Sequence, residues 1–294
     1  GGHGDTCLPA AVPDGLGPLP LPDANDTEVR CVHGGSISSV DDPVPGVRGL
    51  CFVNVTFTAA IVLDLSRFYS PQHTLNITLL QCVLMGLSIR GIGARVHVNV
   101  VFSMLDSGDL EFRGDFGASS QLLVAGCRLL SRSGCAIYFP HFSFGANSTL
   151  QLLGNLIEGK NYAVHFVHTV VVDGGGIVVK GNTLSITDED DGMESALCFN
   201  AVDVKNDGYF DVENNTMNAA NGICFYEDTV VSSAGLLRVA DCNFAGSTEG
   251  FKSALVSFDG WVTLESGAQW RVEGNSVSAA SVLIISHSQY NFSC

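Results

Sequence analysis

Apolar and polar residues alternate in seven short segments of the chain that share one pattern. Each segment closes on an asparagine or a cysteine: Cys82, Cys127, Asn155, Asn182, Asn215, Cys242 and Asn275. The positions five and three residues before the closing residue, and two residues after it, are apolar in all seven segments, as Leu150, Leu152 and Ile157 are around Asn155. Alternation with a period of two predicts a β-strand with one buried face.

Most of these segments recur every 27 to 33 residues, and a second strand-like segment follows several of them. The second segments end on a shared phenylalanine: Phe139, Phe166, Phe199 and Phe225. The number of residues from this phenylalanine to the next pattern segment is nearly constant, whereas the number of residues between the closing residue and the second segment varies. Insertions therefore leave the repeat at one corner, as repeat architectures usually allow. A third apolar stretch lies in the constant gap, as in Val167–Val172 and Thr229–Val231.

A strand repeated in this way can bury its apolar face only by stacking on the equivalent strand of the next coil, about 4.8 Å away. We therefore predict an all-β fold, a right-handed parallel β-helix of the pectin-lyase-like solenoid class. The handedness follows the usual chirality of parallel crossovers. This prediction requires Leu152, Val179, Val212 and Val239 to form one interior column.

Residues 1–48 differ from the rest in composition. Seven of the nine prolines lie there, and proline lacks the amide hydrogen that a strand ladder needs. We predict an irregular leader over residues 1–48, with Cys7 and Cys31 as candidates for holding it, and a solenoid over residues 49–294. The repeats are clearest over residues 120–280. Coil boundaries before Ser120 stay open, because Cys82 and Cys127 are 45 residues apart.

The closing position of the pattern carries asparagine in four coils: Asn155, Asn182, Asn215 and Asn275. Asparagine amides in a bend can satisfy backbone groups that leave the strand ladder. We interpret this column as a structural asparagine ladder rather than as a ligand site.

The chain carries a formal net charge of −16, which disfavours a nucleic-acid groove because such a groove needs clustered Lys and Arg. No apolar run is long enough to span a bilayer. The first residues lack a signal peptide, so we expect a mature chain or a piece of a longer one. Ten cysteines and six Asn-x-Ser/Thr sequons predict a cell-surface or extracellular location. The predicted N-glycosylation sites are Asn25, Asn54, Asn76, Asn147, Asn214 and Asn291.

Cys198 and Cys224 occupy the same position in consecutive coils. Stacking at the coil spacing would bring their Cα atoms within the range that a disulfide accepts, so we predict this bond, with two free surface thiols as the alternative. No Cys-x-x-Cys or His-x-x-x-His spacing occurs, and we expect no metal and no cofactor. The run Asp188–Asp191 is interpreted as a solvated acidic loop rather than a calcium site.

Parallel β-helices include enzymes that cleave acidic polysaccharides, so the outward columns were searched for paired carboxylates. Asp211 is the one carboxylate in its column, and Glu213 and Glu273 lie two coils apart. His165 and His168 flank one strand and are interpreted as surface residues. We therefore predict no catalytic residues.

Several stretches together resemble a known family. They are Phe142–Asn155, Glu158–Val164 and Val172–Leu184, with Asn-Ser-Thr-Leu-Gln-Leu-Leu-Gly-Asn and Asp-Gly-Gly-Gly-Ile-Val-Val-Lys-Gly-Asn at their centres. This resembles the dispersed gene family of trypanosomes, and the chain would be a fragment or a truncated member. The resemblance implies a membrane-anchored surface glycoprotein with a β-helical ectodomain and a role in adhesion to host cells or matrix. The family's membrane anchor is absent from this chain, and no catalytic residues carry over.

The predicted function is therefore a non-enzymatic, extracellular surface β-solenoid that recognises a host extracellular matrix or cell-surface protein or glycan. Partner contacts are expected at the variable corner loops, residues 185–195 and 245–253. Two alternatives stay open: a polysaccharide-processing enzyme of the pectin-lyase-like class, and an inert glycosylated spacer module.

Overall fold

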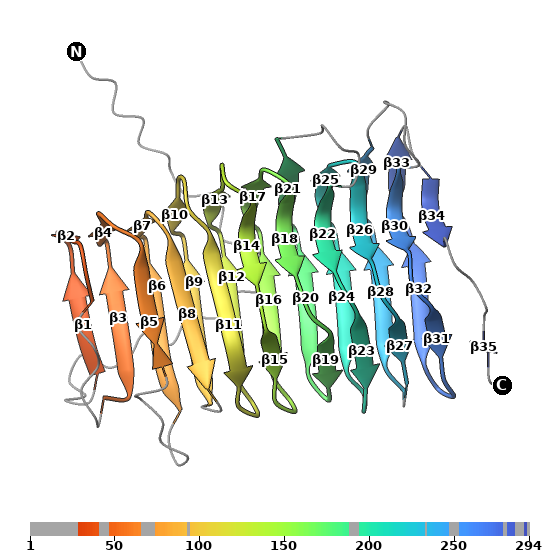
Figure 1. The fold of residues 1–294 in the computed structure, drawn as a ribbon, viewed down its shortest axis with the longest axis horizontal. Helices are drawn as coiled ribbons and strands as arrows, with labels where there is room; N and C mark the ends of the chain where they lie inside the picture. Colours follow the sequence, from red (N-terminus) through yellow and green to blue (C-terminus); the bar gives the residue numbers. More distant parts are fainter. Residues whose placement is uncertain are drawn as a thin grey trace.

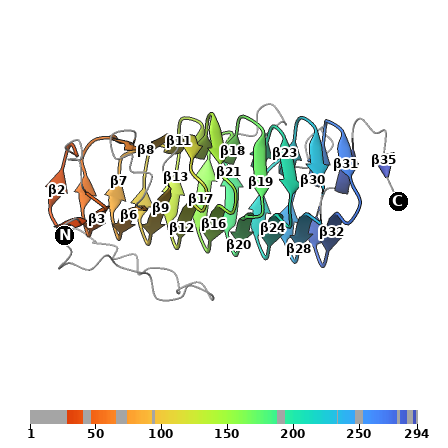
Figure 2. The ribbon, with the colours of Figure 1, turned by 90° about the horizontal axis from the view of Figure 1, so that it is seen from below.

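The computed structural model describes residues 29–40, 47–65, 74–92, 95–187, 194–232, 234–246, 253–278, 281–285 and 291–292. The regular elements in these ranges are β-strands, and no α-helix occurs among them. The chain winds round one long axis, and equivalent strands of successive coils lie side by side (Figures 1 and 2). The predicted all-β, right-handed parallel β-helix is confirmed. Among the described residues, every strand pair between coils is parallel.

Three sheets of ten strands and one of five run along the solenoid in the described residues. Sheet A consists of β1 (Val29–His33), β3 (Gly49–Val53), β6 (Leu75–Leu80), β9 (Val96–Val101), β12 (Gln121–Ala125), β16 (Thr149–Leu153), β20 (Gly176–Lys180), β24 (Tyr209–Glu213), β28 (Leu236–Ala240) and β32 (Gln269–Glu273). Sheet B consists of β2 (Ser36–Ile37), β4 (Thr56–Phe57), β7 (Val83–Leu84), β10 (Met104–Leu105), β13 (Arg128–Leu130), β17 (Leu156–Gly159), β21 (Thr183–Ile186), β25 (Thr216–Asn218), β29 (Asn243–Ala245) and β33 (Ser276–Ser278).

Two further sheets complete the coils. Sheet C consists of β5 (Ile61–Asp64), β8 (Leu87–Ile92), β11 (Leu110–Phe116), β14 (Cys135–Phe139), β18 (Tyr162–Phe166), β22 (Ser195–Phe199), β26 (Asn221–Phe225), β30 (Ala254–Phe258) and β34 (Ser281–Ile285), with β15 (Phe142–Phe144) paired to β11. Sheet D consists of β19 (Val170–Asp173), β23 (Val202–Lys205), β27 (Thr229–Val231), β31 (Val262–Leu264) and β35 (Asn291–Phe292). The third apolar stretch of the repeat is therefore a separate sheet.

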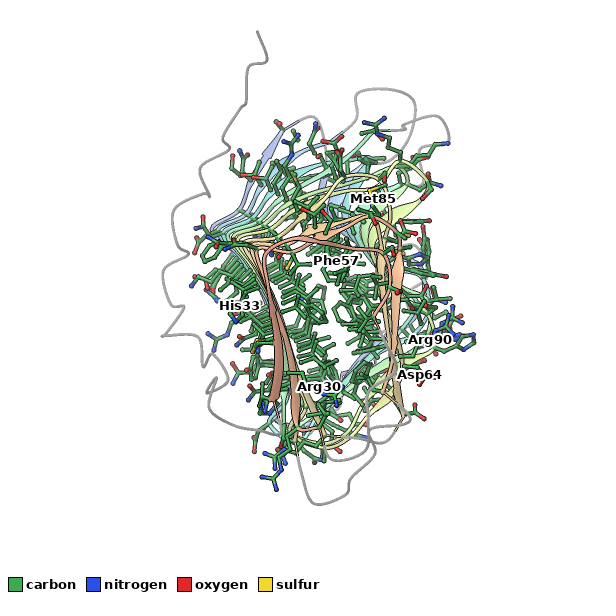
Figure 3. The ribbon with its side chains drawn as sticks, turned by 90° about the vertical axis from the view of Figure 1, so that its left-hand side faces the viewer. Arg30, His33, Phe57, Asp64, Met85 and Arg90 are labelled. Carbon is green, nitrogen blue, oxygen red and sulfur yellow. A yellow bond between two sulfur atoms is a disulfide. The ribbon has the colours of Figure 1, made fainter. Side chains whose placement is uncertain are left out.

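The interior column that the fold prediction requires is present. Leu152 pairs with Val179, Val179 with Val212, and Val212 with Val239. Each of these residues is at most 1% exposed. A view along the axis shows side chains filling the interior (Figure 3). Each coil thus covers the apolar face of its neighbour, which is the main source of stability in a repeat array.

The phenylalanines that end the strands of sheet C form one stack inside the solenoid. The rings of Phe139 and Phe166 lie 4.0 Å apart at an interplanar angle of 2°. The stack continues through Phe199, Phe225 and Phe258, with centroid distances of 4.6, 5.5 and 4.7 Å. A shared register at the coil spacing places like rings directly above one another, so the constant phenylalanine of the sequence repeat has a packing role.

The corner between sheets A and B carries the asparagine ladder. The Oδ1 atom of Asn182 accepts hydrogen bonds from the backbone N–H and the side-chain amide of Asn155, both at 2.9 Å. Asn182 Nδ2 donates to the Leu152 carbonyl at 2.8 Å and to Asn215 Oδ1 at 2.9 Å. Asn275 Oδ1 accepts from the Cys242 N–H at 2.9 Å. The residue before each ladder position has a positive φ, for example 67° at Gly181 and 53° at Asn214, which suits glycine and asparagine.

The uncertain region between Cys82 and Cys127 contains one additional coil. Ser103 occupies its ladder position: the Cys82 N–H donates to Ser103 Oγ at 3.1 Å, 21 residues away. The Ser103 N–H in turn donates to Cys127 Sγ at 3.4 Å, 24 residues away. Val98 and Val100 fill the two apolar columns before it. The repeat was missed there because serine stands in place of the expected asparagine or cysteine.

The boundary predicted at residue 49 is wrong, because the solenoid begins at least 20 positions earlier. Strand β1 pairs in register with β3, from Val29 opposite Gly49 to His33 opposite Val53, and β2 pairs with β4. The prolines of this region flank the two strands and do not interrupt them. Residues 1–28, which include Cys7, lie outside the described residues. Cys31 forms a disulfide with Cys51, with a Cα–Cα distance of 4.4 Å, and this replaces the expected pairing with Cys7.

Among the described residues, no helix has the length and apolar character needed to cross a membrane.

Candidate functional site: an acidic and aromatic groove at one corner

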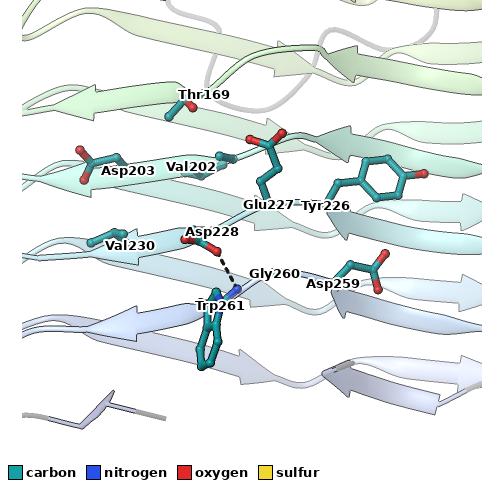
Figure 4. Close-up of a pocket in the computed structure, with 11 residues that line it drawn as sticks. Thr169, Val202, Asp203, Tyr226, Glu227, Asp228, Val230, Asp259, Gly260 and Trp261 are labelled. Carbon is teal, nitrogen blue, oxygen red and sulfur yellow. Dashed lines mark hydrogen bonds between the residues drawn. The ribbon is translucent and has the colours of Figure 1, made fainter. Parts of the chain in front are cut away.

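The corner between sheets C and D is hollowed into a groove of about 780 Å³. Figure 4 shows that its side chains come from successive coils of the solenoid. They are Thr169, Ala201, Val202, Asp203, Tyr226, Glu227, Asp228, Val230, Asp259, Gly260 and Trp261. The groove thus lies across several coils, so a ligand within it would meet each coil in turn.

The backbone of this corner is held by hydrogen bonds between coils. The Tyr226 N–H donates to the Phe199 carbonyl at 3.0 Å, and the Asp259 N–H donates to the Phe225 carbonyl at 2.8 Å. Each corner segment is therefore fixed on the segment of the preceding coil. A side chain that projects from such a corner has a defined position, which reduces the entropy lost on binding.

An exposed aromatic ring and four carboxylates give the groove its chemistry. Trp261 is 42% exposed, and its backbone N–H donates to Asp228 Oδ1 at 3.0 Å. Glu227 and Asp259 are exposed beside it, and Asp203 lies 3.9 Å from Lys205 Nζ. A tryptophan face together with carboxylates can hold a cation, or can stack on and hydrogen-bond a sugar ring.

This groove was not predicted from the sequence, although the chain contains a signal for it. Phe225 pairs in register with Phe258, and Thr229 pairs with Val262. The same number of residues separates the two positions in each coil. This alignment places Asp228 opposite Trp261. The outward strand columns do not predict the groove, because its acidic side chains gather in the corner between two strands.

Behind the groove, a cluster of thiols, phenols and one imidazole covers the outer face of sheet C. Tyr226 connects the two regions, because its hydroxyl hydrogen-bonds with Cys198 and Cys224 and lies 3.4 Å from the Tyr162 hydroxyl. The Tyr162 ring lies 4.4 Å from His165. His165 Nδ1 lies 3.7 Å from Cys135 Sγ.

The protonation states in this cluster do not suit a cysteine nucleophile. Burial lowers the pKa of His165 to about 4. Burial, followed by the negative charge of Asp109, raises the pKa of Cys135 to about 12. Near neutral pH the pair is therefore a neutral thiol beside a neutral imidazole, whereas a reactive cysteine needs the thiolate. Of the two histidines interpreted as surface residues, His168 is exposed, with its ring centroid 4.3 Å from that of His141 in a tilted arrangement, but His165 is partly buried.

The disulfide expected between Cys198 and Cys224 is absent, and this prediction is corrected. The two residues do pair in register on β22 and β26, yet both are free thiols, 0% and 3% exposed. Both sulfurs have polar neighbours. Tyr226 contacts both thiols, and Ser257 and Ser195 hydrogen-bond with Cys224. The alternative of surface thiols is also wrong, because the corner and its tyrosine cover this outward column.

We expect these thiols to resist alkylation in the folded protein. Burial raises the pKa of Cys198 and raises that of Cys224 to about 11, so only about one Cys224 thiol in a thousand is ionised at pH 8. Iodoacetamide at pH 8, followed by peptide mass spectrometry, should label both residues in denaturant and neither in buffer. A Cys198–Cys224 linked peptide in a non-reducing digest would contradict this expectation.

The predicted glycosylation sites fall into three groups. Asn54, Asn147 and Asn214 are exposed residues in turns, with φ between 53° and 57°. Asn76 is half-buried on the outer face of β6, opposite Gly49 and His97. Asn25 and the side chain of Asn291 lie outside the described residues. The run Asp188–Asp191, interpreted above as an acidic loop, also lies outside them. None of the four described sites points into the interior.

The charged outward column of sheet A forms a network of ion pairs rather than an anion site. Arg238 lies 3.1 Å from Asp211, 3.5 Å from Glu213 and 3.4 Å from Glu273. Lys180 lies 3.0 Å from Glu213. Stacking at the coil spacing thus places opposite charges next to one another.

The described residues contain one group of three side chains whose potential metal-ligand atoms lie within 4.8 Å of one another: Cys31, His33 and Cys51. No sequence spacing indicated this group, because coil stacking brings its members together.

Comparison with known proteins adds no assignment: no family model, no curated protein and no solved structure matches the chain.

Proposed function

We propose that the chain is a non-enzymatic β-solenoid, located at the cell surface or outside the cell, that binds a protein or glycan of the host matrix or cell surface. The corner groove is the observation that carries this proposal. A rigid array with an exposed tryptophan and four carboxylates along one groove offers a surface that can be complementary to a ligand. The resemblance to the dispersed gene family of trypanosomes points in the same direction.

Two features support the extracellular location. Cys31 and Cys51 form a disulfide, a bond that persists in oxidising compartments. The sequons at Asn54, Asn147 and Asn214 lie in exposed turns, where an oligosaccharide can attach without disturbing the core. Expression in a secretory host, followed by mass spectrometry after glycosidase treatment, tests these three positions.

Substitution of Trp261 with alanine should weaken ligand binding by about 10- to 30-fold, because a central tryptophan is a common binding hot spot. Asp228→Asn should also weaken binding, and the wild-type affinity should fall with added salt if the ligand carries basic groups. Binding is measured on arrays of matrix proteins and glycans, followed by titration of the strongest ligand.

Leu156→Ala and Asp106→Asn are the matched controls. Leu156 is 40% exposed on sheet B, and Asp106 is exposed between β10 and β11; neither lines the groove. Both variants should bind as the wild type does. Equal binding by Trp261→Ala and Leu156→Ala would place the recognition surface elsewhere.

The carboxylates of the groove favour one second candidate, a polysaccharide-processing enzyme. Glycoside hydrolysis uses two carboxyl groups that flank the bond to be broken, and the groove contains Asp203, Glu227, Asp228 and Asp259. Release of reducing ends from a glycan panel, abolished by Asp228→Asn, would favour this activity over adhesion. The absence of both binding and release would favour an inert spacer.

A further inference from the structure

Cys31, His33 and Cys51 lie together on the outer face of the first coils. Cys31 on β1 pairs in register with Cys51 on β3, and the Cα–Cα distance is 4.4 Å. His33 is two residues beyond Cys31 on the same strand, so its side chain projects from the same face. Figure 3 shows His33 directed away from the interior.

The three side chains match the donor set of a zinc site. Two thiolates and one imidazole are typical zinc ligands, and zinc binds them at about 2.3 Å and 2.0–2.1 Å in tetrahedral geometry. Ligand atoms around one tetrahedral ion are therefore about 3.5–3.8 Å apart. The potential ligand atoms here lie within 4.8 Å of one another, and once the Cys31–Cys51 bond is broken, side-chain rotations can move the two sulfurs apart to this spacing.

The surroundings provide both rigidity and access. Strand β1 pairs with β3 over five residues, which fixes the backbone of all three residues. Cys51 is buried, Cys31 is intermediate and His33 is exposed. An ion can therefore approach from the side of His33, and water can occupy a fourth position, as in zinc sites with three protein ligands.

We propose that Cys31, Cys51 and His33 form a zinc-binding site when the Cys31–Cys51 disulfide is reduced. The disulfide and the metal site are mutually exclusive states of the same residues. A thiol reductant supplies two electrons, the S–S bond breaks, and the reductant becomes a disulfide. Zinc then binds both sulfurs, and each thiol loses its proton to the solvent. The site lies on sheet A, so it is independent of the ligand proposed for the corner groove.

The test is a titration of the folded full chain with Co²⁺ as a spectroscopic substitute for Zn²⁺, before and after mild reduction. The reduced protein should bind one ion, with thiolate-to-cobalt charge-transfer absorption and the visible bands of a tetrahedral site. Added Zn²⁺ should displace the cobalt. Zn²⁺ should also raise the Tm of the reduced protein, because a ligand that binds only the native state stabilises it. The oxidised protein should show none of these changes.

Variants separate this site from the other thiols. Reduced Cys31→Ser should lose the charge-transfer absorption, and His33→Ala should weaken Zn²⁺ binding by at least about 10-fold, since even outer-shell partners contribute 10- to 100-fold. His141→Ala, which removes an exposed histidine between β14 and β15, should bind as the wild type does. Equal cobalt spectra for reduced wild type and Cys31→Ser would overturn the proposal, as would binding by the oxidised protein. Loss of the first coil on reduction, with no cobalt binding, would overturn it too.

Discussion

Phe199→Ala should lower the free energy of unfolding by about 3–5 kcal/mol, the usual cost of removing a buried phenylalanine. The Phe199 ring is fully buried and stacks between Phe166 and Phe225, at 4.6 and 5.5 Å. It also meets the edge of Phe210 at 4.9 Å. Truncation would leave a cavity in the middle of the phenylalanine stack, where neighbouring coils are held by parallel strand pairing and cannot collapse into it. Urea unfolding followed by circular dichroism measures the loss.

A matched control removes an apolar side chain of similar bulk from the surface. Met85 is 45% exposed between β7 and β8, and Met85→Ala should change the free energy of unfolding by no more than about 0.5 kcal/mol. Phe199→Leu should fall between the two variants. If Phe199→Ala were as mild as Met85→Ala, the phenylalanine stack would not be the stabilising feature inferred here.

Asn182→Ala is expected to lower the free energy of unfolding by about 3 kcal/mol, because it removes four hydrogen bonds in a buried corner. The Asn155 N–H loses its acceptor and the Leu152 carbonyl loses a donor, whereas Asn215 keeps its bonds with the Asn182 N–H and the Val179 carbonyl. Asn182 is 1% exposed, so water cannot easily replace the lost partners. Urea unfolding, with loss of amide-exchange protection at Asn155, is the measurement.

Asn218→Ala is the control for the ladder, because Asn218 is an exposed asparagine on sheet B, three residues after Asn215. It should leave stability almost unchanged. Asn182→Asp keeps the acceptor, removes the donor and places a charge in a buried corner, so it should be at least as destabilising as Asn182→Ala. A stability loss confined to Asn182→Asp would show that charge burial, and not the missing hydrogen bonds, is the dominant effect.

The ladder also explains why three residue types share one column. Ser103 and Cys127 each accept a backbone N–H from the preceding coil, at 3.1 and 3.4 Å. Asn155 and Asn182 accept in the same way. All four side chains also donate to a strand carbonyl of the preceding coil, Ser103 and Cys127 at 3.4 and 3.3 Å, and Asn155 and Asn182 at 2.9 and 2.8 Å. An asparagine amide has a second proton, which Asn155 donates to Asn182 Oδ1 and Asn182 donates to Asn215 Oδ1, whereas a hydroxyl or thiol has one proton to donate. The asparagine coils therefore have an additional side-chain hydrogen bond at this corner.

The features that the sequence predicted correctly have a local, repeated signal. The apolar columns at Leu152, Val179 and Val212, the second strands ending on phenylalanine and the closing asparagines all recur at a regular spacing. The features that it did not predict have a weak signal or one hidden by substitution. Ser103 broke the column of asparagine and cysteine, and the prolines around β1 and β2 obscured a coil whose interior register positions carry Arg30 and Val32 opposite Leu50 and Phe52.

The candidate groove and the thiols show the limit of that reasoning. Register alone placed Cys198 beside Cys224, but register does not reveal whether an outward column is solvated. Tyr226 and the corner segments decide this, and they turn the column into a buried, protonated cluster. The groove likewise depends on how Asp228 and Trp261 face one another across two coils.

The sequence by itself determined the coil: which residues point inward, which close the bend, and that each coil must stack on the next. It could do so because side-chain direction along a strand follows from backbone geometry, with a period of two that a single sequence displays. Only the tertiary structure decided what lies on the outside of that coil. Coverage of a surface, the shape of a corner groove and the meeting of Cys31, His33 and Cys51 depend on segments brought together across coils, and the period of two along a strand does not report which segments cover one another.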